Sequence, residues 1–95
     1  MFLSFQQVAA TSSVKTQSAL TIPGGATHAE LQACTQNVRY TMDNTTDPTQ
    51  TSGMVLITTE SPKLFLIEDV KRIRFVRGAG SDGNLNIHYV GGRNV

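Results

Sequence analysis

Asp43, Asn44 and Asp47 form the densest cluster of acidic and amide side chains in the sequence. Calcium prefers oxygen ligands of this kind, so the cluster is a candidate metal loop. The EF-hand pattern is absent, because Pro48 stands where that loop needs glycine and Met54 stands where it needs glutamate. Asp and Asn also close turns with their own side chains, and an Asp-Pro pair favours turn initiation. We therefore predict an exposed polar loop without a metal, and a looser calcium site remains the alternative.

Arg72, Arg74 and Arg77 form, with Lys71, the densest positive cluster. Arginine recognises carboxylates through paired hydrogen bonds and is enriched at protein interfaces, so the cluster is a candidate contact for an acidic protein partner. The acidic residues at 68–69 lie beside it and neutralise part of its charge. A solvated face of a sheet is the simpler interpretation.

Two histidines and one cysteine are further side chains that could bind a metal or act in catalysis. His28 and His88 fall on polar faces of predicted strands, and nothing in the sequence brings them together. Cys34 is the only cysteine, which excludes an intramolecular disulfide, and we expect it to be a small buried residue. The chain has no Gly-x-Ser-x-Gly elbow and no glycine-rich phosphate loop that leads into a helix. We therefore expect no catalytic site, no metal, no cofactor and no enzymatic activity.

Short stretches of alternating or continuous apolar residues must position these side chains. Turn residues separate the stretches, and no convincing long amphipathic helix interrupts them. This pattern indicates an all-β fold, a single small β-sandwich of jelly-roll or immunoglobulin-like type, with a small barrel as the alternative. The predicted strands are 14–22, 27–34, 38–42, 53–59, 63–67, 72–77 and 85–90.

Four segments carry more detailed predictions. Segment 27–34 is predicted as a strand, with a helix as the alternative because its residues are also good helix formers. The apolar runs at 53–59 and 63–67 predict strands that are covered on both faces. The charged segment 68–73 fits one helical turn or a corner between sheets. The Asp-Gly pair within 78–84 predicts a hairpin with a type I′ turn.

The two ends of the chain do not fit the predicted sheets. The first dozen residues carry Phe2, Leu3 and Phe5, which is too much apolar surface for a disordered tail, so this segment packs either on its own core or on a neighbour. The last residues are polar and glycine-rich. We expect an N-terminal arm at 1–12, a β-sandwich domain at 13–91 and a flexible tail at 92–95.

Length and charge limit the classes of function. A chain of 95 residues builds one hydrophobic core and therefore one domain. The formal net charge is +1, so no broad electrostatic field favours nucleic acid or an anionic membrane as a partner. The first ten residues lack the positive region of a signal peptide and are too short and broken for a membrane span.

Three stretches together carry a family resemblance: "LTIPGGATHAELQA", "VRYTMDNTTDPTQTSGMVL" and "IRFVRGAGSDGNLNIHY". The sequence resembles a family of small structural proteins encoded among the virion genes of tailed bacteriophages, over about residues 20 to 90. The resemblance implies an all-β protein that is made in the bacterial cytoplasm and incorporated on the capsid exterior. Its implied partner is the major capsid protein, with copies of the chain itself as a second partner.

The resemblance implies a capsid decoration or cement protein that binds many capsid subunits and stabilises the shell. On this hypothesis, an apolar anchor and a basic contact bind the capsid. The anchor residues are Phe2, Leu3 and Phe5, and the basic residues are Arg72, Arg74 and Arg77. A tail or connector component of the virion is an alternative that differs in location.

A carbohydrate-binding or host-surface module is the alternative from another class. The piece "YT.D...DPT" is similar to a motif in immunoglobulin-like domains appended to bacterial glycosidases, although Asn44 replaces the usual glycine. Sugar binding needs exposed aromatic rings, whereas Tyr40 and Tyr89 are both predicted to face the core. We therefore rank it below the capsid hypothesis.

Overall fold

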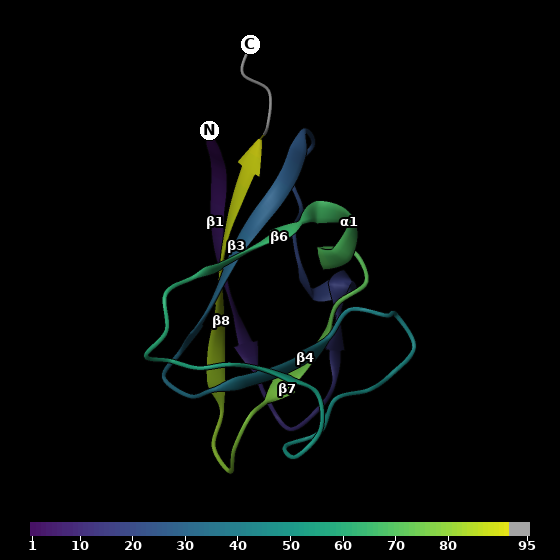
Figure 1. The fold of residues 1–95 in the computed structure, drawn as a ribbon, viewed down its shortest axis with the longest axis vertical. Helices are drawn as coiled ribbons and strands as arrows, with labels where there is room; N and C mark the ends of the chain where they lie inside the picture. The colour runs from purple at the N-terminus through teal and green to yellow at the C-terminus, as the bar shows by residue number, and fades with distance from the viewer. Residues whose placement is uncertain (92–95) are drawn as a thin grey trace.

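Two antiparallel four-stranded sheets, named sheet A and sheet B, enclose the hydrophobic core (Figure 1). The computed structural model describes residues 1–91, so the predicted tail at 92–95 lies outside the described residues. Sheet A contains, in spatial order, β1 (Phe2–Ala10), β8 (Gly83–Gly91), β3 (Ala26–Cys34) and β6 (Lys63–Leu66). Sheet B contains β2 (Lys15–Thr16), β7 (Arg74–Arg77), β4 (Val38–Thr41) and β5 (Met54–Leu56).

The strand pairs are nested along the chain. β1 pairs with β8, β2 with β7, β3 with β6 and β4 with β5, so the chain is one long antiparallel hairpin rolled up on itself. Lateral pairs between β3 and β8 and between β4 and β7 complete the two sheets. This nested order is that of an eight-stranded jelly roll. The predicted β-sandwich is thus confirmed, and of the two types expected the jelly roll is the one found.

The inward-facing residues of β3, β4 and β8 form the centre of the core. Their alternation of polar and apolar residues was read correctly from the sequence, and segment 27–34 is a strand rather than a helix. Each large side chain removed from water in this way stabilises the fold by roughly 1.5–3 kcal/mol. The fully or nearly fully buried residues of these strands include Ala29, Leu31, Val38, Tyr40, Leu85, Ile87 and Tyr89.

The structure corrects the predicted N-terminal arm at 1–12. Nine residues of this segment form β1, which pairs antiparallel with β8 along its length (Figure 1). The sequence pattern misled because the usual polarity is reversed here. Phe5 lies on the outer face, whereas Gln6 is half-buried, and its amide is hydrogen-bonded to the hydroxyl of Tyr89 and to the backbone of segment 19–21.

The predicted strand at 14–22 is also shorter than expected. Only Lys15–Thr16 pair with β7, and Gln17–Ala19 form a 3-10 helix, η1. The hydroxyl oxygen of Thr16 accepts a hydrogen bond from the N–H of Ser18 at 3.3 Å. Serine and threonine side chains compete in this way with the hydrogen bonds of a sheet, which ends the strand.

The apolar runs at 53–59 and 63–67 are not covered on both faces. They form β5 and β6, which lie at edges of the two sheets. Leu56 and Phe65 pack against the core, but Met54, Leu64 and Leu66 remain more than half exposed. A continuous apolar run therefore signals, in this chain, an edge strand with an apolar outer surface.

Segment 78–84 does not form the predicted hairpin, because β7 belongs to sheet B and β8 to sheet A. A type I′ turn requires positive φ angles at both of its central residues. Neither Asp82 nor Gly83 has a positive φ, so the pair does not form this turn. Gly83 instead permits a close backbone approach, since a Cβ atom there would lie 2.8 Å from Gln36. The preceding charged segment contains one helical turn, α1 (Ile67–Val70), which matches one of its two predicted forms.

Candidate partner-binding surface

The outer face of sheet A carries large apolar side chains that remain in contact with solvent. On β1, Phe2 is 56% exposed and Phe5 is 60% exposed. On β6, Leu64 is 61% exposed and Leu66 is 56% exposed. β8 and β3 separate these two strands, so the face carries one pair of exposed apolar side chains at each of its edges. Large exposed apolar side chains that gather on one face are typical of interaction sites.

Strand register places the phenylalanine, histidine and glutamate side chains of this face in one row, named the aromatic row. Phe5 lies opposite His88 and His88 lies opposite Glu30. The rings of Phe2 and His88 are stacked with centroids 3.9 Å apart, and Phe5 meets the same imidazole edge-on at 6.0 Å. The His88 Nδ1 atom lies 3.9 Å from Glu30 Oε1. The imidazole is therefore surrounded by two phenyl rings and a carboxylate.

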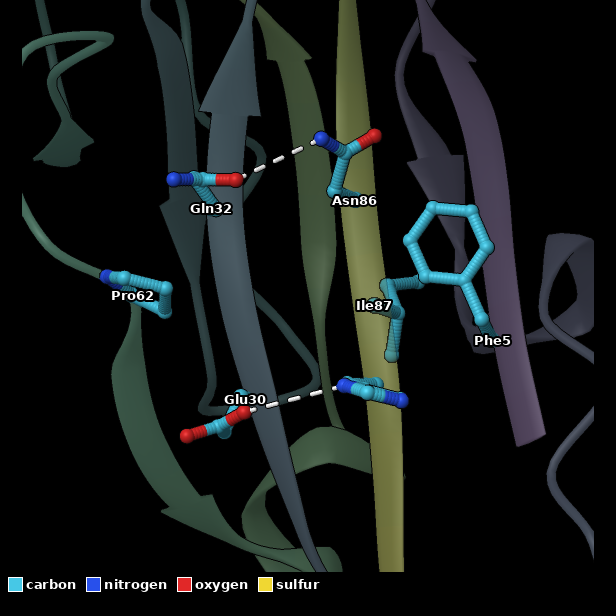
Figure 2. A pocket seen from close by; sticks show the side chains of 7 residues that line it. Phe5, Glu30, Gln32, Pro62, Asn86 and Ile87 are labelled. Atoms are coloured by element: carbon cyan, nitrogen blue, oxygen red, sulfur yellow. Dashed lines mark hydrogen bonds and ion pairs between the residues drawn. The ribbon is translucent and has the colours of Figure 1, made fainter. Parts of the chain in front are cut away.

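A row of amide side chains runs beside the aromatic row. Gln7 Nε2 donates a hydrogen bond to Asn86 Oδ1 at 2.8 Å, and Asn86 Nδ2 donates to Gln32 Oε1 at 3.5 Å. The row crosses β1, β8 and β3, and Figure 2 shows Gln32 and Asn86 pointing toward one another above the sheet. Each amide of this row uses part of its hydrogen-bonding capacity on its neighbour, and these bonds orient the three side chains.

A shallow depression lies between these rows. Phe5, Glu30, Pro62 and Asn86 are among the residues that line it, and its volume is about 90 Å³ (Figure 2). Sites that enclose small molecules usually measure about 300–1,000 Å³. The surface is therefore suited to side chains of a protein partner or to one sugar ring, rather than to an enclosed cofactor.

The structure does not bring the two predicted contact groups together. Phe2, Leu3 and Phe5 belong to β1 in sheet A, whereas the arginines belong to β7 of sheet B and its preceding turn. Two of the three arginines are engaged within the chain, and Arg72 is exposed. Arg74 Nη1 donates to Asp47 Oδ1 at 2.6 Å, and Arg77 Nη1 donates to Asp82 Oδ1 at 2.9 Å.

Asp43 is the centre of a closed turn in the loop between β4 and β5. Its Oδ1 atom accepts hydrogen bonds from the N–H groups of Thr45 and Thr46, and its Oδ2 atom accepts one from the Thr46 hydroxyl at 2.6 Å. The Thr46 hydroxyl and N–H, followed by the Thr45 N–H, hold the pKa of Asp43 well below its usual range. Asn44 takes a positive φ of 62°, which Asn tolerates better than most residues. These contacts match the turn-closing role predicted for Asp and Asn.

The same loop folds back over the outer face of sheet B. Besides the pair with Asp47, Arg74 donates a hydrogen bond from Nη2 to the backbone oxygen of Asn44 at 2.9 Å. Pro48 is fully buried, and it lines a groove together with Val76. This covering explains why Val76 is buried although the neighbouring Phe75, and not Val76, faces the core. The polar residues Asp43, Asn44 and Asp47 are themselves exposed.

The remaining candidate residues are the two histidines and the cysteine. His28 and His88 lie on adjacent strands of sheet A, and His28 Nδ1 lies 3.0 Å from the hydroxyl of Thr27. Cys34 is half-buried rather than buried as predicted. Within residues 1–91, no group of three or more His, Cys, Asp or Glu side chains is placed to hold a metal ion. Over the same range, no helix has the length and apolar character needed to cross a membrane.

Comparison of the sequence with protein-family models and with curated proteins, and of the fold with solved structures, finds no match.

Sequence reasoning missed half of this surface. Leu64 and Leu66 were assigned to a covered strand, and His88 was assigned only to a polar face. The run at 64–67 gave no signal that its outer face stays exposed, because every strand presents alternate residues to opposite faces and all four of these residues are apolar. The stacking of Phe2 on His88 had no signal either, since the two residues are separated by nearly the whole chain.

Proposed function

We propose that this chain is a structural protein of a tailed-bacteriophage virion that binds the major capsid protein on the head exterior and stabilises the shell. The observation that carries a protein-binding role is the exposed apolar outer face of sheet A. The identity of the partner follows from the family resemblance. The jelly-roll fold is compatible with this role because it recurs in viral capsid proteins, although fold alone does not assign function.

The anchor of this proposal is a surface rather than a flexible arm. Phe2 and Phe5 provide its β1 side and Leu64 and Leu66 its β6 side, with the polar rows of β3 and β8 between them. The apolar side chains at the two edges and the polar groups between them offer a partner both apolar contacts and hydrogen bonds. Of the proposed basic contacts, Arg72 is the most available to a partner, because Arg74 and Arg77 already pair with Asp47 and Asp82.

Point substitutions test the proposal better than deletion of residues 1–12, because that deletion would remove a complete strand of sheet A. Purified protein carrying Phe5→Ser or Leu64→Ser is mixed with expanded capsids that lack it, and occupancy is measured by cosedimentation. Met54→Ser is the matched control, since Met54 is 63% exposed on β5 of sheet B. We expect each sheet A variant to bind at least about tenfold more weakly and the control to bind normally.

Unchanged occupancy of both sheet A variants, or an equal loss in the Met54 variant, would remove sheet A from the proposal. Location is tested separately by cryo-electron microscopy of the assembled particle. Density for the protein over the capsid lattice supports decoration of the head. Density confined to the tail or connector would transfer the proposed role to that part of the virion.

Carbohydrate binding is the second candidate, and the exposed aromatic row favours it more than the sequence did. Tyr40 and Tyr89 are buried as predicted, but Phe5 is exposed beside a carboxylate and an amide row. A sugar ring stacks on an aromatic face while its hydroxyl groups bond to such polar side chains. Glycan-array binding that is lost on Phe5→Ser and kept on Met54→Ser would support this candidate.

A further inference from the structure

The four edge strands of the two sheets differ in how well they are protected. β2 has two residues, β5 has three and β6 has four, whereas β1 has nine. Pro62 precedes β6 and Lys63 begins it, and α1 follows it directly. Short length, proline and lysine are the features by which natural sheets prevent edge-to-edge pairing. Three edges are therefore protected, and β1 is the exception.

β1 has the composition of a strand that can accept another strand. Its sequence, FLSFQQVAA, contains no charged residue and no proline. Alternate N–H and C=O groups of an edge strand point away from its sheet and have no partner within it. The one irregularity lies between Phe2 and Ser4, so residues 4–9 keep a regular register with β8.

We propose that the free edge of β1 pairs with β1 of a second copy of this chain, antiparallel about a two-fold axis, so that two copies of sheet A form one continuous eight-stranded sheet. This self-association goes beyond the proposed function and does not depend on capsid binding.

The order of side chains along β1 favours a second copy as the occupant. The phenylalanines stand at its beginning, at positions 2 and 5, and the alanines at its end, at positions 9 and 10. Antiparallel pairing with Gln6 on the axis places Phe5 beside Gln7 of the partner copy and Ser4 beside Val8. Each of these pairs joins a larger side chain with a smaller one, and both lie within the regular part of β1.

Charge also permits the pairing. A two-fold axis places each residue near its symmetry-related neighbours, so a charged strand would meet like charge, and like charges directly opposite destabilise a sheet. β1 has no charge to oppose, and the whole chain has a net charge of only +1. Pairing ends at Ala10, which is fully buried, and the carbonyl of Thr11 already accepts a hydrogen bond from Arg77 N–H at 2.9 Å.

The interface is modest in size. Pairing through one strand buries less than the roughly 800 Å² per partner of a standard interface, so we expect a dissociation constant in the micromolar range. The pairing would place the apolar outer faces of the two copies on the same side of one continuous sheet. If the proposed function holds, the dimer binds two capsid sites at once, and multivalent binding strengthens attachment without new contacts.

Analytical ultracentrifugation of the full chain over a concentration series tests the proposal. One variant carries Phe5→Lys and Gln7→Lys, and a second carries Phe5→Glu and Gln7→Glu. In the proposed register, position 5 of one copy lies beside position 7 of the other, so each variant places like charges together. A mixture of the two variants places opposite charges together. The control carries Leu64→Lys and Leu66→Lys on β6, and circular dichroism checks that every variant is folded.

We expect the unmodified chain to form a dimer and each β1 variant to dissociate at least about tenfold more readily. We expect the mixture to regain dimers and the β6 variant to behave as the unmodified chain. A chain that stays monomeric at millimolar concentration, a mixture that stays monomeric, or dissociation caused by the β6 variant would each overturn the proposal. Capsid occupancy is a separate measurement, so failure of capsid binding and failure of self-association are distinguishable.

Discussion

The side chain of Gln6 connects three parts of the fold and should determine whether β1 is an integral strand. Its Oε1 atom accepts hydrogen bonds from the Tyr89 hydroxyl and from the Thr21 N–H, both at 3.0 Å. Its Nε2 atom donates a longer bond, 3.4 Å, to the carbonyl of Ala19. Tyr89 itself is fully buried in β8. A change at Gln6 therefore leaves a hydroxyl group inside the sandwich without this partner.

The magnitude of the Gln6→Ala effect follows from these contacts. In the Gln6→Ala variant the buried Tyr89 hydroxyl has lost its hydrogen-bond acceptor, which costs about 1–3 kcal/mol. The loss of the more exposed bond to Thr21 adds about 0.5 kcal/mol. We expect a total loss of roughly 1.5–3.5 kcal/mol of unfolding free energy, which lowers the Tm of a domain of this size by about 5–25 °C. Tyr89→Phe alone should cost about 1 kcal/mol, because Gln6 keeps its bond with Thr21.

Urea denaturation followed by far-ultraviolet circular dichroism measures the unfolding free energy of the two single variants and of the double variant. The double variant, Gln6→Ala with Tyr89→Phe, should lose about 1 kcal/mol less than the sum of the single losses, because no hydroxyl remains stranded. Gln7→Ala is the matched control on the same strand, and its bond to Asn86 is exposed, so we expect a loss below about 0.5 kcal/mol. If the double variant loses the full sum of the two single losses in unfolding free energy, or if Gln6→Ala and Gln7→Ala have equal effects, the bond between Gln6 and Tyr89 does not have this role.

Three further predictions concern other parts of the molecule. Gly83→Ala places a Cβ atom 2.8 Å from Gln36 and should destabilise the fold by roughly 1–3 kcal/mol in thermal denaturation, whereas Gly80→Ala meets nothing within 4 Å and should be nearly neutral. The pKa of Asp43 is lowered from 3.8, so its stabilising effect is present above that pH and is lost on acidification. Asp43→Asn should therefore lower the Tm at neutral pH and reduce the fall of Tm with decreasing pH. An equal fall of Tm with decreasing pH in the variant and the unmodified chain would contradict this. Burial raises the pKa of Tyr89 to about 12, so stability falls as pH rises from 10 toward 12, and an absorbance titration should show delayed ionisation that Tyr89→Phe removes.

The strands of the core were predictable from the sequence because their side chains alternate. In β3 and β8 every second residue is apolar and buried, and this local pattern determines which face turns inward. The pairing of strands was not predictable in the same way. Nothing local distinguishes a connection within one sheet from one that crosses between sheets, so segment 78–84 was read as a hairpin.

The candidate surface was predictable only in part, for a related reason. The apolar character of Phe2, Leu3 and Phe5 was visible and led to the prediction of a contact, but their place in sheet A depends on pairing with the last strand of the fold. The pairing of Arg74 with Asp47 likewise joins two segments that are 27 residues apart. Long-range pairing decides which charges are satisfied within the chain and which remain available to a partner.

The rolled hairpin explains why the two outer faces of the sandwich differ. The tip of the hairpin, the loop between β4 and β5, is long enough to fold back and cover β7 in sheet B, where Pro48 and Val76 are buried and Arg74 is paired. The two ends of the hairpin, β1 and β8, lie side by side in sheet A (Figure 1). On the outer side of these two strands Phe2 and Phe5 remain exposed, and His88 is half-buried. A partner is therefore expected where the chain ends meet, rather than at the polar loop that first suggested a binding site.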